Sequence, residues 1–155
     1  MGKKILVLDD KRKVRRDMKA HIKREDRSSD LRICGDCCSV IYELDLLKSK
    51  GEQPFDLFIL DLNINTIGLT DGEAKKTENG LRTGWVLFID EILKRDPANR
   101  AKVVFFSGWL KRLEDYIESV AANKDEKELY YELKKNGRLI EKAEGYASLD
   151  QFIAS

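Results

Sequence analysis

Residues 4–10, Lys-Ile-Leu-Val-Leu-Asp-Asp, form an apolar run that stops at two adjacent carboxylates. Short continuous apolar runs are typical of strands in a parallel sheet with helices on both faces. Three later runs, 57–60, 103–106 and 139–140, also lead to a polar residue at or just after their ends. Because the carboxyl ends of parallel strands meet at one edge, where such sheets bind ligands, we expect five side chains to gather there. They are Asp9, Asp10, Asp61, Ser107 and Lys142.

Helix and strand patterns alternate along the chain, which favours βαβ units and an α/β fold with a doubly wound, five-stranded parallel sheet. Residues 1–155 are expected to form a single domain. A short last helix should begin at Ser148, since Ser-Leu-Asp-Gln at 148–151 resembles a capping box. The expected strands are 4–9, 31–35, 56–61, 102–107 and 138–142, and the expected longer helices are about 12–25, Val40 to Leu47, 84–95 and 110–135.

The expected cluster favours one kind of chemistry. Asp9, Asp10 and Asp61 repel one another when close, and a hard divalent cation relieves this repulsion. Magnesium fits best, because it uses few carboxylates, keeps several waters and shares its remaining positions with phosphate oxygens. Lys142 adds a positive charge and Ser107 a hydrogen-bond donor, and both could hold a phosphoryl group beside Asp61. Asp61 is then the expected nucleophile, since a carboxylate can form an aspartyl phosphate.

The order Asp-Asp, Asp, Ser, Lys at the ends of successive strands resembles the receiver domain of two-component response regulators over essentially the whole chain. The resemblance implies a flavodoxin-like sheet with strand order 2-1-3-4-5. It also implies that Asp9 and Asp10 are the acidic metal pair, Asp61 the phosphoacceptor, Ser107 the switch hydroxyl and Lys142 the invariant lysine.

The resemblance implies roles for two further residues. Asn63 lies where receivers supply a backbone carbonyl to the metal, and Trp109 lies where they tune water access to the phosphoryl group. A bulky indole at Trp109 should shield the aspartyl phosphate. The resemblance also implies Mg²⁺ as cofactor and a histidine kinase or histidine phosphotransfer protein as phosphodonor.

Several features depart from the receiver pattern. Ala143 follows the lysine where receivers usually have a cis proline, Leu139 stands where many use an aromatic switch, and the last helix has little room. The connection 63–83 is long, with turn signals at 70–72 and 78–80, and is either a functional lid or recognition loop or a mobile insertion. The stretch 109–136 is expected to be an extended or doubled helix, interrupted at 123–128, with Val120 on its apolar face.

Composition and charge limit the kinds of partner that the protein can have. The net charge is +1, which gives no global argument for nucleic acid or an anionic membrane. Residues 11–27 nevertheless hold nine Lys or Arg against three Asp or Glu, which suits a docking face for the phosphodonor, a phosphate-backbone contact or merely a solvated face. No run approaches the ~18 apolar residues of a membrane helix and the N-terminus does not resemble a signal peptide, so the expected location is cytoplasmic.

The cysteines and the histidine are expected to be structural. Cys34, Cys37 and Cys38 lack a second cluster, which favours reduced thiols over zinc or a disulfide. His21 is expected on the flank of the first helix, with no second residue at a spacing typical of metal ligands.

Three classes of function remain open. The favoured one is a stand-alone receiver that signals through its changed surface. The second is a receiver-like docking module that is not phosphorylated, and the third is a small phosphohydrolase with an aspartyl nucleophile. The Asp-x-Asp spacing of haloacid dehalogenase-type enzymes is absent at both candidate strand ends.

Overall fold

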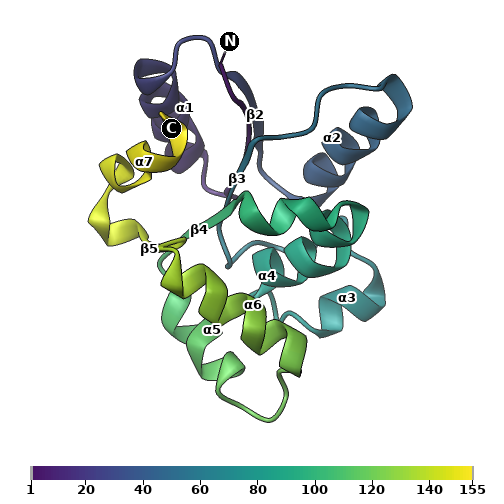
Figure 1. The fold of residues 1–155 in the computed structure, drawn as a ribbon. Helices are drawn as coiled ribbons and strands as arrows, with labels where there is room; N and C mark the ends of the chain where they lie inside the picture. Colours follow the sequence, from purple (N-terminus) through teal and green to yellow (C-terminus); the bar gives the residue numbers. More distant parts are fainter. Residues whose placement is uncertain (1, 155) are drawn as a thin grey trace.

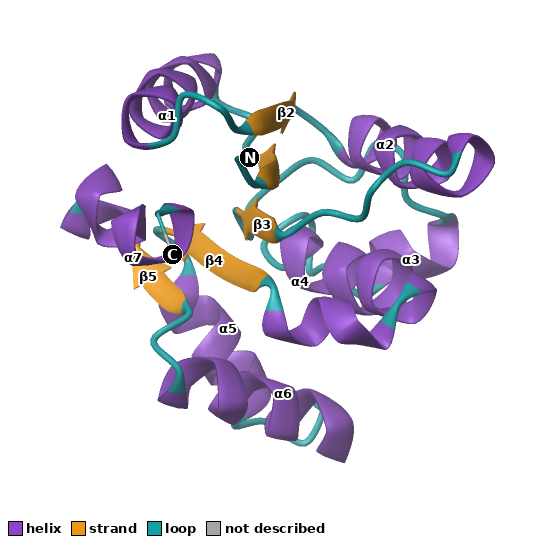
Figure 2. Ribbon diagram, turned by 45° about the horizontal axis from the view of Figure 1, so that its top comes forward, coloured by secondary structure: helices purple, strands orange, loops and turns teal. Residues whose placement is uncertain are grey.

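The computed structural model describes residues 2–154, which fold around a five-stranded parallel sheet of order β2-β1-β3-β4-β5 (Figures 1 and 2). The predicted fold class and strand order are therefore confirmed. The strands are β1 Lys4–Leu8, β2 Asp30–Cys34, β3 Leu57–Leu60, β4 Val103–Ser107 and β5 Leu139–Glu141. The α-helices are α1 Arg12–Glu25, α2 Cys37–Lys50, α3 Asp71–Lys75, α4 Thr83–Leu87, α5 Leu110–Ile117, α6 Lys124–Lys135 and α7 Asp150–Ile153. A π-helix, Phe88–Leu93, continues α4, and short 3₁₀ helices occupy Pro97–Ala101, Lys142–Glu144 and Tyr146–Leu149.

The three central strands, β1, β3 and β4, are buried on both faces, which explains why they are nearly continuous apolar runs. Along β1, Leu6 and Leu8 belong to the core beneath α2, α4, α5 and α6, whereas Ile5 and Val7 belong to the core beneath α1 and α7. Successive side chains of a strand point to opposite faces, so the interior residues of a strand covered on both faces are apolar.

Helix α2 extends beyond the predicted Val40 to Leu47 at both ends. The Asp36 side chain accepts a hydrogen bond from the Ser39 backbone N–H, and Gly51 ends the helix with φ of 61°. Glycine adopts this left-handed conformation without the steric cost that a Cβ would bring. Asp36 and Gly51 therefore set the two ends of this helix.

The long connection 63–83 has regular structure of its own, contrary to the prediction. The expected turn at 70–72 is instead the start of α3, where the Thr70 side chain and Glu73 form a capping box. The second expected turn is present, because Glu78, Asn79 and Gly80 all have positive φ. The segment is thus a short helix followed by a tight turn.

The stretch 109–136 forms two helices, but the break between them does not lie at 123–128 as predicted. Residues 124–128 belong to α6, whose first turn is capped by the Asn123 side chain. The actual break lies between α5 and α6, and Val120 in this break is fully exposed rather than part of an apolar face. The helical periodicity cannot apply to Val120 because the helix has already ended at Ile117.

The expected capping box at Ser148 does not form. Gly145, with φ of 85°, leads into the 3₁₀ helix that contains Ser148, and the Ser148 hydroxyl donates to the Gly145 carbonyl. The last α-helix therefore starts only at Asp150.

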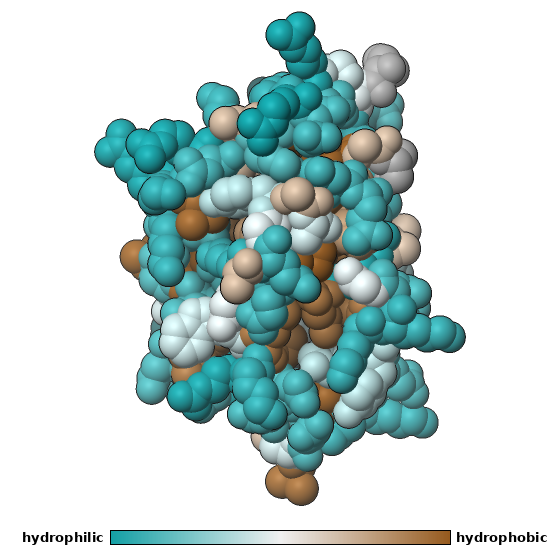
Figure 3. Space-filling model, turned by 90° about the vertical axis from the view of Figure 1, so that its left-hand side faces the viewer, coloured by the Kyte–Doolittle hydropathy of each residue, from teal (hydrophilic) through white to brown (hydrophobic). Residues whose placement is uncertain are grey.

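The face that carries α1, α7 and α5 is mostly hydrophilic at its margins and has hydrophobic atoms near its centre (Figure 3). None of the helices in the described part of the chain is long and apolar enough to cross a membrane.

Candidate functional site

Two buried carboxylates lie side by side at the carboxyl edge of the sheet. Asp9 and Asp61 directly follow β1 and β3, which pair in register through Leu8 and Leu60. The Asp61 backbone N–H donates to the Leu8 carbonyl at 3.0 Å and so fixes this arrangement. Both side chains are almost fully buried, and such burial of two like charges requires compensation.

Lys142 supplies that compensation. Its Nζ lies 2.6 Å from Asp9 Oδ2 and 2.7 Å from Asp61 Oδ2. Burial alone would lower the pKa of Lys142, but the hydrogen bonds and charges of the two carboxylates outweigh it and raise the pKa. Burial also raises the pKa of Asp9, with the charge of Asp61 acting in the same direction and Lys142 opposing it. The ammonium group is thus held between the two carboxylates and stays charged.

Ser107 orients the other oxygen of Asp61. The Ser107 hydroxyl donates to Asp61 Oδ1 at 2.5 Å, and the Leu62 backbone N–H donates to the same oxygen at 2.7 Å. Ser107 is itself placed by β4 and accepts a hydrogen bond from the Trp109 N–H at 3.1 Å. Both oxygens of Asp61 therefore face donors, which fixes the rotation of the carboxylate.

The three predicted acidic residues are close enough to share a cation. Carboxylate oxygens of Asp9, Asp10 and Asp61 all lie within 4.8 Å of one another. Asp10 is exposed and, together with Asn63, lines an open cavity of about 830 Å³ beside the buried pair. A set of three carboxylates with access to solvent suits a hard divalent cation such as Mg²⁺.

The role of Gly84 was not predicted from the sequence. A Cβ added at Gly84 would lie 1.9 Å from the backbone oxygen of Asp61, so only glycine allows α4 to approach so closely. The Gly84 N–H donates to the Leu62 carbonyl at 3.0 Å. A glycine inside a predicted helix is the only signal that could have pointed to this contact.

The basic helix contributes one residue to the site. Arg15 of α1 donates from Nη1 to the Asp9 backbone carbonyl at 2.9 Å and so helps to fix the loop after β1. Trp109, the proposed gate, precedes α5 and is about one third exposed. Its backbone reaches Ser107, while the role of its indole stays a prediction.

The expectation that His21 has no neighbouring residue placed to share a metal ion is wrong. His21 is buried, and its Nε2 lies 2.6 Å from Asp150 Oδ1, with Glu25 also close. The spacing of His21 and Glu25 on one helix face was visible in the sequence, but the contact with Asp150 joins positions 129 residues apart. Only the fold brings these three side chains together.

Solved structures with the same fold include one receiver domain and two further response regulators. The receiver domain of the Francisella response regulator 1452 matches with a TM-score of 0.55 and 16% identity, over 97% of this chain and 93% of that one. The bacteriophytochrome response regulator AtBRR matches with a TM-score of 0.53 and 12% identity, over 99% and 91%. The Mn(2+)-bound form of response regulator Rcp1 matches with a TM-score of 0.50 and 18% identity, over 98% and 89%.

No protein-family model matches the sequence, and no curated protein matches it. The structural matches extend over nearly the whole chain, and they establish that it has the receiver fold. At these identities they support the fold alone, so the function has to be argued from the site.

Proposed function

We propose that the protein is a stand-alone response-regulator receiver that accepts a phosphoryl group on Asp61 in a Mg²⁺-dependent reaction. The observation that carries the proposal is the environment of Asp61, a buried carboxylate that receives Ser107 on one oxygen and Lys142 on the other. Positioned donors of this kind stabilise the charge that develops on a transferring phosphoryl group.

In the proposed reaction an oxygen of Asp61 attacks the phosphorus of a phosphohistidine. The new bond joins phosphorus to the aspartate oxygen, and the bond between phosphorus and the imidazole nitrogen breaks. The leaving imidazole keeps the electron pair of the broken bond. If it then becomes protonated, the proton comes from solvent. Ser107 and Lys142 then donate to phosphoryl oxygens, because these oxygens carry the charge that the free carboxylate carried before.

Asp9, Asp10 and Asp61 would hold the magnesium ion, and the backbone carbonyl of Asn63 would complete the protein's ligands. When bound, the ion neutralises negative charge on the phosphoryl oxygens. The solved structure of a response regulator with Mn(2+) supports a divalent cation in this fold. Trp109 is proposed to limit the access of water and so to slow the loss of the phosphoryl group.

The phosphodonor in this proposal is a histidine kinase or a histidine phosphotransfer protein. The protein acts in the cytoplasm and signals by protein–protein interaction, with neither nucleic acid nor a membrane as partner. Its own catalysis is confined to phosphotransfer and autodephosphorylation, so it is not an enzyme in the usual sense.

Two observations favour the second candidate, a receiver-like docking module. Lys142 already offsets part of the negative charge of Asp9 and Asp61 by direct contact, so the acidic pair depends less on a metal ion. The described residues also contain no cis peptide bond, so the loop at Ala143 lacks the shape that receivers usually have there.

Incubation with acetyl phosphate separates the two candidates. With Mg²⁺ the protein should gain one phosphoryl group by intact mass, and with a chelator it should gain none. Asp61→Asn should stay unmodified, whereas Asp115→Asn, on the exposed face of α5, should behave like the wild type. A folded wild type that binds Mg²⁺ but is never modified would favour the docking module.

A further inference from the structure

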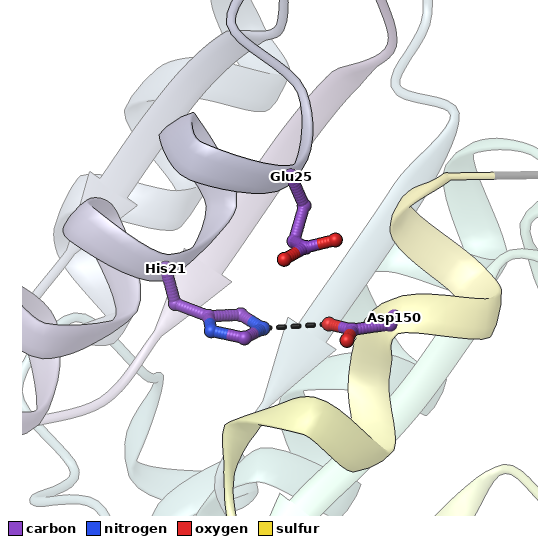
Figure 4. A group of neighbouring side chains, drawn as sticks. All are labelled: His21, Glu25 and Asp150. Carbon is purple, nitrogen blue, oxygen red and sulfur yellow. Dashed lines mark hydrogen bonds and ion pairs between the residues drawn. The ribbon is translucent and has the colours of Figure 1, made fainter.

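A second group of potential metal ligands lies away from the phosphoacceptor site, between α1 and α7 (Figure 4). His21 and Glu25 are four positions apart on α1, and Asp150 is the first residue of α7. Their ligand atoms all lie within 4.8 Å of one another. The cluster therefore combines an imidazole with two carboxylates from two helices.

The His21 ring is oriented with Nε2 toward the carboxylates. Arg24 Nη2 lies 3.0 Å from His21 Nδ1, and since a guanidinium only donates, Nδ1 must be the acceptor. The proton of the neutral ring is then on Nε2, which donates to Asp150 Oδ1 at 2.6 Å. The ring is buried and packs against the Tyr146 ring, with centroids 5.9 Å apart, so this orientation is well fixed.

Glu25 leaves the cluster with unbalanced negative charge. Its carboxylate has no hydrogen bond or ion pair with the residues that the structure describes, 2–154, although it lies beside Asp150. Figure 4 shows its carboxylate next to the contact between His21 and Asp150. Two neighbouring carboxylates without a cation between them repel each other, and a divalent ion would remove that repulsion.

We propose that His21, Glu25 and Asp150 form a binding site for a transition metal ion of the Zn²⁺ class, which joins α1 to α7. One nitrogen and two oxygen ligands would leave the fourth tetrahedral position to water, as in zinc sites that have three protein ligands. The imidazole separates this site from the all-oxygen cluster of Asp9, Asp10 and Asp61, because imidazole suits zinc, copper and nickel, whereas carboxylates and water suit magnesium.

Metal binding requires a change at Arg24. A neutral imidazole that binds the metal through Nε2 carries its proton on Nδ1, where it would face the N–H groups of Arg24. Arg24 is exposed and free to turn away, and its positive charge also opposes a nearby cation. Replacement of Arg24 should therefore strengthen metal binding, which a merely structural role of the cluster does not predict.

The chain contains one histidine, so every histidine signal in a tag-free protein reports on His21. Nitrogen-15 NMR should show a proton on Nε2 without metal and a proton on Nδ1 after addition of Zn²⁺. The titration is done with Mg²⁺ in millimolar excess, so that the acidic cluster at the sheet edge is already occupied. A stoichiometry of one Zn²⁺ per chain is expected under these conditions.

Three variants complete the test. Glu25→Gln should weaken Zn²⁺ binding by roughly tenfold or more, since even residues that only support a ligand contribute that much. Glu118→Gln, another exposed glutamate, should bind as the wild type does. Arg24→Gln should bind several-fold more tightly. Glu25→Gln keeps its fold because the residue is exposed, so a negative result with it is interpretable.

The proposal is overturned if the His21 nitrogen signals do not respond to Zn²⁺. It is equally overturned if Glu25→Gln binds Zn²⁺ as the wild type does, or if Arg24→Gln binds it more weakly. The readouts involve no phosphorylation, so the outcome is independent of the function proposed for Asp61.

Discussion

Replacement of Gly84 by alanine should both destabilise the protein and disturb its site. The added Cβ would meet the Asp61 backbone oxygen at 1.9 Å, the Asp61 carbonyl carbon at 2.9 Å and the Leu62 Cα at 3.2 Å. All three are backbone atoms, so no flexible side chain can move aside, and either α4 or the end of β3 must shift. A shift of the end of β3 would displace Asp61 from Ser107 and Lys142.

The net cost follows from two opposing effects. Overpacking of a tightly packed site costs about 1–3 kcal/mol, and the upper end applies to a backbone contact this short. Alanine is favoured over glycine in a helix by about 1 kcal/mol, which offsets part of the cost. We expect a net loss near 2 kcal/mol in the free energy of unfolding, or a Tm lower by about 4–8 °C in a domain of this size.

Urea unfolding of Gly84→Ala measures the loss, with Gly72→Ala as the matched control. Gly72 also lies in a helix, and the nearest heavy atom to its added Cβ is 4.0 Å away, so its alanine variant should be unchanged or slightly more stable. Phosphorylation by acetyl phosphate should be slowed in Gly84→Ala well below the temperature at which it unfolds. A Gly84→Ala protein as stable and as reactive as the wild type would refute the close approach of α4 to Asp61.

Three other predictions address the metal, the basic helix and the gate. Asp10→Ala should weaken Mg²⁺ binding measured by calorimetry, whereas Lys142→Ala should bind Mg²⁺ at least as tightly, since a nearby positive charge is removed; loss of Mg²⁺ from a folded Lys142→Ala would contradict this. The wild type should not bind duplex DNA near physiological ionic strength, and submicromolar, salt-sensitive binding that is lost on charge reversal of α1 would overturn this. Beryllofluoride with Mg²⁺ should change tryptophan fluorescence in the wild type and in Trp85→Phe but much less in Trp109→Phe. Trp109→Glu should also lose its phosphoryl group faster than the wild type, and equal lifetimes would show that the indole does not shield it.

The sequence predicts that the residues of the candidate site lie together because they obey a rule that is local to each strand. Asp61 and Ser107 end apolar runs that parallel-sheet geometry places next to each other, and Lys142 follows the last strand. The doubly wound architecture and the strand order came from the same pattern together with the resemblance to receivers.

The features that sequence reasoning missed depend on contacts between distant residues. The need for glycine at position 84 appears only when α4 is packed on the end of β3. Likewise, His21 meets Asp150 only because α7 folds back onto α1. Two smaller errors had local causes. Val120 lies beyond the end of α5, so the helical periodicity does not apply to it. The residues after Thr70 form a helix rather than the predicted turn.

Direct localisation of the phosphoryl group tests the central claim. The wild type is incubated with acetyl phosphate and Mg²⁺, the acyl phosphate is trapped by borohydride reduction, and the modified residue is identified by peptide mass spectrometry. The account predicts modification at Asp61 alone, dependent on Mg²⁺ and absent from Asp61→Asn. Trapping at Asp9 or Asp10, or stoichiometric modification of Asp61→Asn, would contradict it.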